Sequence, residues 1–361
     1  MIDPATLIAA APPIPVPWEV FEGLRLAAFL LHLIAMNILL GGALIAAVAS
    51  GRDSALPGHA ARSLAHALPT VMAVAVNLGV PPLLFIQVVY GQFFYASSIL
   101  MAWIWLAVIG ILIIAYYSLY LHDWRLGRAG PERADASSAF VRLAAALLAA
   151  NAFIYVCNLS QTQDPAGWPG AIGAAGAIQG TFLPLADPAL VPRFVHFVIG
   201  AVAVAGLALA LAGRLGWFAR PDERTQAYGL RVFFFATLAQ IGAGAWFLVS
   251  QPGAVSRLFL GESPLATGLL VAAALLTVAA LVLAQNRAVL PCALATLGIL
   301  AAMTLMRELV RLSRLAPYFH PQDLRLVPEY GPAVLFAAIL ALALCALWWL
   351  ARQLPRAGKG A

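Results

Sequence analysis

Charged residues are scarce in this chain, and their scarcity excludes a water-soluble protein of this length. Of the 361 residues, only 10% are charged and 63% are hydrophobic, and the mean hydropathy is +0.91. A soluble core of this size cannot bury so much apolar surface, so the solvent for most of the chain is a lipid bilayer. The charges collect between apolar runs of roughly 18–25 residues, the helical length that crosses about 30 Å of hydrocarbon.

Lysine and cysteine are also rare. The net charge of +6 comes almost entirely from arginine, since Lys359 is the only lysine, and no basic patch typical of nucleic-acid binding is present. The three cysteines, Cys157, Cys292 and Cys345, form no CxxC, CxxCH or zinc spacing, so covalent c-type haem and a cysteine metal site are not expected. Residues 1–17 lack a positive n-region and a cleavage site, and their prolines predict an irregular lead-in.

Nine apolar runs predict an all-α integral membrane protein, a nine-span helical bundle that forms a single transmembrane domain over residues 1–361. The expected spans are 20–48, 67–90, 99–121, 139–157, 195–213, 228–250, 266–285, 288–306 and 331–352. With the N-terminus outside, twice as many basic residues fall on the inner side as on the outer side. The positive-inside rule therefore favours N-out, C-in, in a bacterial inner (cytoplasmic) membrane.

Four arginines of the predicted outer side cluster in residues 307–325, directly after the eighth span. One interpretation is an interfacial helix whose arginines extend to the lipid headgroups. The other is a binding site for the carboxylates of a cofactor. The sequence leaves both open.

Two of the six histidines lie in predicted spans, where an ionisable group costs roughly 2.5–3.5 kcal/mol and suggests a function. His32 is in the middle of the first span, near Gly41 and Gly42, which leave room for a macrocycle or for close helix packing. His196 opens the fifth span, one turn after Arg193. A neutral imidazole at either position can coordinate haem iron, with Arg193 facing a propionate. The alternative for each histidine is an interhelical hydrogen bond without a cofactor.

Three segments around these residues resemble subunit I of the cytochrome bd-type quinol oxidases. They are RLAAFLLHLIAMNILLGGAL, NLGVPPLLFIQVVYGQFF and RFVHFVIG, in the first, second and fifth spans. The resemblance implies nine spans with the N-terminus outside, in which His32 ligates one of the paired oxygen-side haems and His196 the low-spin haem near the outer face. It divides the chain into a family-like haem-binding part, about 18–213, and divergent C-terminal spans, about 214–361.

The chain departs from this family at the parts that serve quinol and oxygen. Where the family has acidic residues in its second and third spans, this chain has Gln87 in the second span and no Asp or Glu in the third. The long quinol loop and the late GRQPW-like element are also missing. In the family, methionine opposes the low-spin haem histidine, but the seventh span here has none. We expect Met306 or Met303 to be the sixth ligand, with Arg307 facing a propionate; His320 is a further candidate. The alternative for both methionines is packing.

Together these features predict a haem-b-binding membrane subunit for respiratory electron transfer, with one or two haems b. It would relay electrons between the membrane and a periplasmic partner, a c-type cytochrome or another redox subunit, with quinone as a further candidate and no nucleic acid. Two alternatives stay open. One is a divergent bd-like terminal oxidase, an oxidoreductase that uses His32 for an oxygen-reactive haem. The other is a cofactor-free transporter or assembly scaffold, although the third, seventh and ninth spans offer few polar residues for transport.

Overall fold

The computed structural model describes residues 3–50, 55–128, 134–172, 177–217 and 220–357, and in these ranges it contains helices, loops and two isolated β-bridges. Nine of the described helices are long and apolar enough to cross a membrane, which confirms the nine predicted spans. These helices are α1 (Trp18–Ala49), α2 (Gly58–Val89), α4 (Ala102–Arg128), α5 (Ala134–Thr162), α6 (Leu190–Leu215), α7 (Glu223–Val249), α9 (Pro264–Gln285), α10 (Val289–Leu315) and α11 (Tyr330–Ala357). Lys359 lies outside the described residues.

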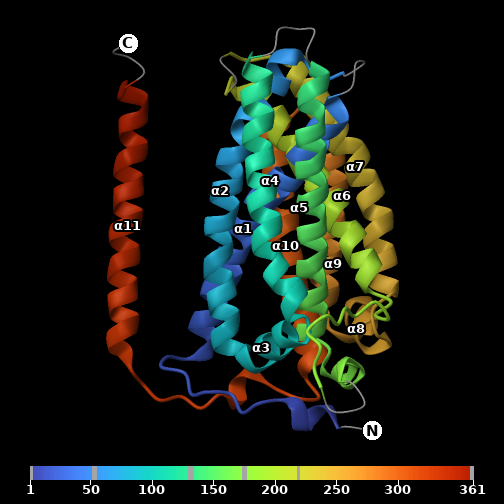
Figure 1. The fold of residues 1–361 in the computed structure, drawn as a ribbon, viewed down its shortest axis with the longest axis vertical. Coiled ribbons are helices and arrows are strands. Elements are labelled where there is room, and N and C mark those ends of the chain that lie inside the picture. The colour runs from blue at the N-terminus through green and yellow to red at the C-terminus, as the bar shows by residue number, and fades with distance from the viewer. Residues whose placement is uncertain (1–2, 51–54, 129–133, 173–176, 218–219, 358–361) are drawn as a thin grey trace.

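Short helices connect these spans. They are η1 (Pro4–Leu7), α3 (Gly91–Leu100), η3 (Pro165–Ala171), α8 (Gly253–Arg257), the π-helical turn η4 (Leu258–Glu262) and η5 (Pro321–Asp323). We call the end of the bundle where α1 begins the N-terminal end, and the opposite end the C-terminal end. Both α3 and α8 lie at the N-terminal end, and the chain between α10 and α11 runs along it (Figure 1).

Helix α1 is at the centre of the bundle, where it packs against α2, α5, α6 and α10. Small residues let the helix backbones approach closely. Such packing is expected in a bilayer, because the hydrophobic effect does not drive one apolar helix against another in lipid. A Cβ atom on Gly41 would lie 2.0 Å from the carbonyl oxygen of Ala201, so α1 and α6 are in backbone contact there. On the other side of α6, a Cβ atom on Gly229 of α7 would lie 2.5 Å from the backbone nitrogen of Ala210. Of the two roles considered for Gly41, the structure shows close helix packing.

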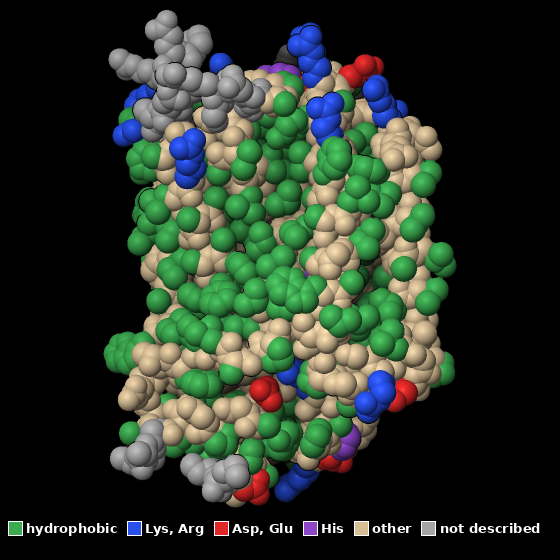
Figure 2. Space-filling model, turned by 90° about the vertical axis from the view of Figure 1, so that its right-hand side faces the viewer, with side chains coloured by type: hydrophobic (Ala, Val, Ile, Leu, Met, Phe, Trp, Pro, Cys, Tyr) green, Lys and Arg blue, Asp and Glu red, His purple; other side chains and the backbone are tan. Residues whose placement is uncertain are grey.

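The surface between the two ends is apolar. Figure 2 shows hydrophobic side chains over the middle of one face, with Arg, Asp and Glu side chains near the two ends. This distribution fits a multi-pass protein in which lipid contacts the middle of the helices and the charged side chains lie at the interfaces.

Helix α11 stands apart from the other helices (Figure 1), and none of the residues in its span Tyr330–Leu350 is buried. The chain before it is attached to the lead-in, because Val327 donates its N–H to the carbonyl oxygen of Ile14 at 2.9 Å and Ile14 donates to that of Arg325 at 2.9 Å. The start of α11 is therefore positioned by backbone hydrogen bonds. Further along α11, the Phe336 ring lies edge-on to the Phe85 ring of α2, with 6.3 Å between the centroids.

The arginine-rich segment after the predicted eighth span is part of that span. Helix α10 continues unbroken to Leu315, so Arg307, Arg311 and Arg314 lie on its last turns. Arg311 is 0% exposed and cannot extend to the headgroups. The interfacial-helix interpretation is therefore wrong for Arg311, because the buried carboxylate of Glu308 holds its guanidinium inside the bundle.

Candidate functional site

His32 is held by its neighbour helix through one ring nitrogen. Its Nδ1 lies 2.9 Å from the carbonyl oxygen of Ala75 on α2, a distance at which Nδ1–H donates to the carbonyl. With the proton on Nδ1, a neutral ring keeps a free lone pair on Nε2, and such a bond is how proteins orient a metal-binding histidine. The ring reaches Ala75 because residue 79, one turn further on α2, is glycine: a Cβ atom there would lie 2.8 Å from Cε1 of His32.

Gly79→Ala tests this packing. Because the added Cβ atom would overlap the imidazole, we expect the substitution to displace His32 and to cost about 1–3 kcal/mol in stability, as overpacking does. Gly110→Ala on α4 is the matched control, since nothing lies within 4 Å of its Cβ position and alanine favours a helix by roughly 0.5–1 kcal/mol. Thermal unfolding in detergent measures both. Equal midpoints for the two variants would contradict the described packing of His32.

His196 faces α7. The side-chain amide nitrogen of Gln240 lies 3.0 Å from Nδ1 and 3.1 Å from Nε2 of His196. The two ring nitrogens point in different directions in the ring plane, so one donor equally near both cannot align with the lone pair of either. Packing rather than a directed hydrogen bond therefore sets the ring: a Cβ atom on Gly244 would lie 3.3 Å from Cε1, and the Phe247 ring centroid is 5.9 Å away.

Arg193, one turn before His196, is 4% exposed. It donates a hydrogen bond from Nη1 to the hydroxyl oxygen of Ser160 at the end of α5, and its guanidinium carbon lies 5.4 Å from the Phe247 ring centroid. Ser160 and Phe247 carry no charge, so Arg193 has no directly bonded counter-ion among the described residues. The Asp164 carboxyl is close enough to interact with it electrostatically, and burial raises the pKa of that carboxyl.

Arg307 contacts the His32 region, and it is also close enough to Arg193 to interact with it electrostatically. Its guanidinium carbon is 4.1 Å from the Phe29 ring centroid, and the Phe29 ring centroid is 6.5 Å from that of His32. Met306 instead packs in an apolar cluster with Val255 and Phe259. The described contacts of His196 include neither Met303 nor Met306, and His320 is exposed in the loop after α10. A methionine ligand to a haem on His196 thus stays a prediction.

A buried ionic network joins α1, the α2–α3 junction and α10 at the N-terminal end. It consists of Glu22, Arg25, Tyr90, Glu308 and Arg311. Arg25, 2% exposed, donates to the carboxylates of both Glu22 and Glu308. Glu308 also accepts from the Tyr90 hydroxyl at 2.9 Å and from Nη1 of Arg311 at 2.7 Å. Each acidic side chain is paired, as charges removed from water must be.

The network leaves cationic hydrogen-bond donors unused. Nε and Nη2 of Arg311 are buried, and neither has a hydrogen-bond partner in the part of the chain that the structure describes. Arg314, one turn further, is 3.5 Å from the Asp187 carboxylate. Arg307, Arg311 and Arg314 share one face of α10, where the described carboxylates do not use every donor.

The predicted site residues thus form two groups. His32 and Arg307 meet around Phe29 where α1, α2 and α10 pack, while His196 and Arg193 face α7 and the end of α5. The buried ionic network was not expected from the sequence. The sequence does contain two acid–arginine pairs at i,i+3 spacing in apolar helices, Glu22 with Arg25 and Glu308 with Arg311. Their spacing cannot show that the two helices pair with each other.

The described residues place this chain among the multi-pass, all-helical membrane proteins, with nine helices long and apolar enough to cross a membrane. The sequence matches no protein-family model, and it matches no curated protein. Among solved structures, the chain is similar to the bd oxidase from Geobacillus thermodenitrificans, with a TM-score of 0.66 and 14% sequence identity, over 98% of this chain and 99% of that chain. The fold is therefore a distant bd-oxidase-like fold, spanning the whole length of the described bundle.

Proposed function

We propose that this chain is a haem-b-binding membrane subunit for respiratory electron transfer, and a divergent relative of subunit I of the bd-type oxidases. The observation that carries the proposal is the geometry of His32, whose Nδ1 is bonded to a backbone carbonyl, because a neutral ring held in this way keeps a lone pair on Nε2 that could ligate iron. The bd-oxidase-like fold supports it. The family-like part, about 18–213, holds both candidate ligands, and the spans after 214 complete the bundle.

The residues around the two histidines suit haem b. His196 would ligate one haem, with Arg193 beside it as a propionate partner and Met306 or Met303 as the proposed sixth ligand. His32 would ligate a second haem, with Arg307 and the unpartnered donors of Arg311 available to its carboxylates. When bound, haem b supplies a reversible one-electron iron couple. The chain's own contribution is to orient each imidazole and to place buried cations around the site.

The proposed orientation puts the N-terminal end outside and the C-terminus inside a bacterial inner membrane. The end that holds Arg193 and the last turns of α10 then faces the periplasmic side. A c-type cytochrome or another redox subunit is the proposed partner there. A quinone in the membrane is the second candidate for electron exchange.

A spectrum of the purified protein tests the proposal. We expect a b-type band in the reduced-minus-oxidised difference spectrum and one or two haems b per chain in a pyridine haemochrome assay. Absence of any b-type band after expression with adequate haem supply would overturn the proposal. It would favour the cofactor-free transporter or scaffold instead.

A divergent terminal oxidase is a second candidate function. The observation that favours it is the buried ionic network, because Glu22 and Glu308 supply buried carboxylates that the second and third spans lack. An oxidase requires a high-spin haem that binds carbon monoxide, and His32→Ala should abolish that binding while the His196 haem survives. A reduced spectrum unchanged by carbon monoxide would contradict the oxidase and leave the electron-transfer proposal standing.

A further inference from the structure

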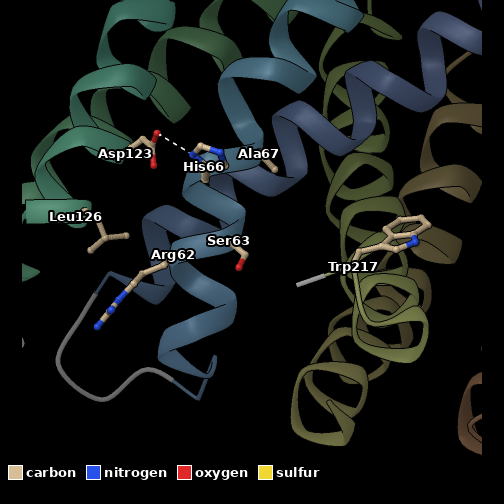
Figure 3. Close-up of a pocket in the computed structure, with 8 residues that line it drawn as sticks. Arg62, Ser63, His66, Ala67, Asp123, Leu126 and Trp217 are labelled. Atoms are coloured by element: carbon tan, nitrogen blue, oxygen red, sulfur yellow. Dashed lines mark hydrogen bonds and ion pairs between the residues drawn. The ribbon is translucent and has the colours of Figure 1, made fainter. Parts of the chain in front are cut away.

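Two hollows in the described part of the bundle have volumes of about 450 and 340 Å³, within the usual range of small-molecule sites, roughly 300–1,000 Å³. The larger one, at the C-terminal end, brings no set of donors together. In Figure 3 the side chains of Arg62 and Ser63 point away from each other, while His66 and Asp123 pair with one another at 3.2 Å. The smaller one lies midway along the bundle, between α1 and α2.

This second hollow is an apolar groove that opens sideways. Leu31 on one wall is 54% exposed and Val74 on the other is 47% exposed, so the groove follows the outer surface of the two helices. Because α1 and α2 both span the membrane, that surface faces hydrocarbon, and a ligand reaches it from the bilayer. The lining residues are Leu31, Ile34, Ala35 and Ile38 on α1, and Thr70, Val71, Val74 and Leu78 on α2.

The backbone hydrogen bonding of α2 is interrupted beside the groove. Pro81 and Pro82 lie inside this helix and have no N–H, so the carbonyl oxygens of Asn77 and Leu78, four residues earlier, lose their helical donors. No described residue from another part of the chain donates to either oxygen. In a membrane helix such freed carbonyls are normally bonded by a neighbouring helix, a side chain or water, because an unmet polar group in hydrocarbon is costly.

Asn77 adds a side-chain acceptor at the same place. It is exposed, and its amide nitrogen donates to the carbonyl oxygen of Ala73 at 2.8 Å, which leaves Oδ1 without a donor among the described residues. Val74, Leu78 and Pro81 share one face of α2, and Asn77 adjoins both Val74 and Pro81 on the helix surface. Three acceptor oxygens therefore lie beside the apolar groove, in the middle of a span.

We propose that this groove binds an uncharged phenolic lipid, whose hydroxyl donates to the oxygens of Asn77 and Leu78 and whose ring and chain lie against the apolar lining. The head is a hydrogen-bond donor, because the site offers acceptors. It is uncharged, because the site lies midway along two spans, where a charge is costly. An aromatic ring with a hydroxyl dissolves at this depth, whereas the ester groups of a glycerolipid hold its hydroxyl near the interface.

The groove is next to His32, since Leu31 is part of its lining and the following residue is bonded to α2. The site gives a place to the quinone considered above, whose reduced form is a phenol, and for that role it rests on the proposed function. It differs from the long outer loop that serves quinol in the bd-type family, which this chain lacks. Binding of the phenol needs no haem, so it can be tested separately.

A matched pair of ligands tests the site. The full chain in phosphatidylcholine nanodiscs is titrated, without oxygen and under reducing conditions, with a labelled decylhydroquinone and with its dimethyl ether, which keeps the ring and chain but has no O–H. Partition into empty nanodiscs is subtracted. We expect wild type to bind the phenol roughly tenfold more tightly than the ether, because the ether cannot bond the unmet acceptors.

Variants of α2 show which oxygens are used. Asn77→Leu should remove most of the preference for the phenol. Gln87→Leu is the matched control and should keep it, because the Gln87 amide is already bonded to Leu83 and Tyr95. Pro81→Ala should weaken the preference in part, since the alanine N–H can bond the Asn77 carbonyl. Equal thermal midpoints show that the bundle is intact in each variant.

A second pair of variants tests the groove itself. Val74→Phe fills the groove, so it should weaken binding of the phenol and of the ether alike. Val80→Phe is its control, because Val80 is 48% exposed on the same helix but does not line the groove. Similar affinities in these two variants would show that the ligand binds elsewhere.

Other results would also overturn the site. Equal affinity for the phenol and its ether would show that no hydroxyl is recognised, and equal effects of Asn77→Leu and Gln87→Leu would remove Asn77 from the contact. Tighter binding of dioctanoylglycerol than of the phenol would identify an aliphatic lipid alcohol as the ligand. Dimers that Val74→Phe dissociates would show that the groove is an interface between copies of the chain. Absence of a b-type band, by contrast, would overturn the proposed function and leave this site standing.

Discussion

His196→Ala is expected to remove one haem b from the purified protein and to abolish the low-spin part of the difference spectrum. The imidazole is the proposed iron ligand, and the neighbours of His196 in the structure, Gln240, Phe197 and Phe247, offer no equivalent nitrogen base. Haem stoichiometry by pyridine haemochrome, together with reduced-minus-oxidised spectra, measures the loss.

Two comparisons decide whether the loss reports ligation. His59→Ala, which changes an exposed histidine paired with Asp222 at the C-terminal end, should leave the haem content unchanged. His32→Ala should remove a different spectral component, because its ring packs against α2 and not against α7. If His196→Ala keeps the wild-type spectrum and stoichiometry, His196 is a packing residue and the haem must be placed elsewhere.

Glu308→Leu is expected to be among the most destabilising single changes in the bundle, by about 3–5 kcal/mol, the cost of breaking a buried ion pair from one side. The change strands the guanidinium of Arg25, which then shares only Glu22, and leaves Arg311 without its bonded carboxylate. The Tyr90 hydroxyl also loses its acceptor. Thermal unfolding in detergent, followed by circular dichroism, measures the effect.

Two variants calibrate that prediction. Glu308→Gln retains an acceptor for Tyr90 and for one guanidinium, so it should cost clearly less than leucine. Arg257→Ala breaks an exposed pair with Glu262 and should cost about 0–1 kcal/mol, the usual value for a surface salt bridge. Glu308→Leu with a midpoint close to that of Arg257→Ala would show that the network contributes little, and that water reaches it readily.

The spans were predictable because a bilayer requires long apolar helices with satisfied backbones, and that requirement appears in the sequence as uninterrupted runs. The third run was predicted to start at 99, whereas Leu100 closes α3 and the span begins at Ala102. The break lies at Met101, whose φ of −120° and ψ of 31° are not helical, and a break of this kind lies in backbone conformation rather than in composition. The orientation of the termini and the two haems remain predictions.

Pairing of residues remote in the chain was not predictable. From the sequence, the arginines after position 306 fitted either an interfacial helix or a binding site for cofactor carboxylates. In the structure α1 brings Arg25 to Glu308, and Arg311 is buried beside the same carboxylate. Likewise, no periodicity relates Gly79 to His32 or Gly244 to His196, yet the missing side chain of each glycine leaves the space that an imidazole occupies.

By itself, the sequence determined that this protein is a nine-span helical membrane protein and which two histidines lie inside it, because hydropathy and the cost of a buried ionisable group act on each segment separately. Only the tertiary structure decided what those histidines face, which arginines are paired, and that donors of Arg311 are left without partners. The physical reason is that helix packing depends on the shapes and charges of two surfaces at once. The sequence of one helix does not show which other helix it packs against.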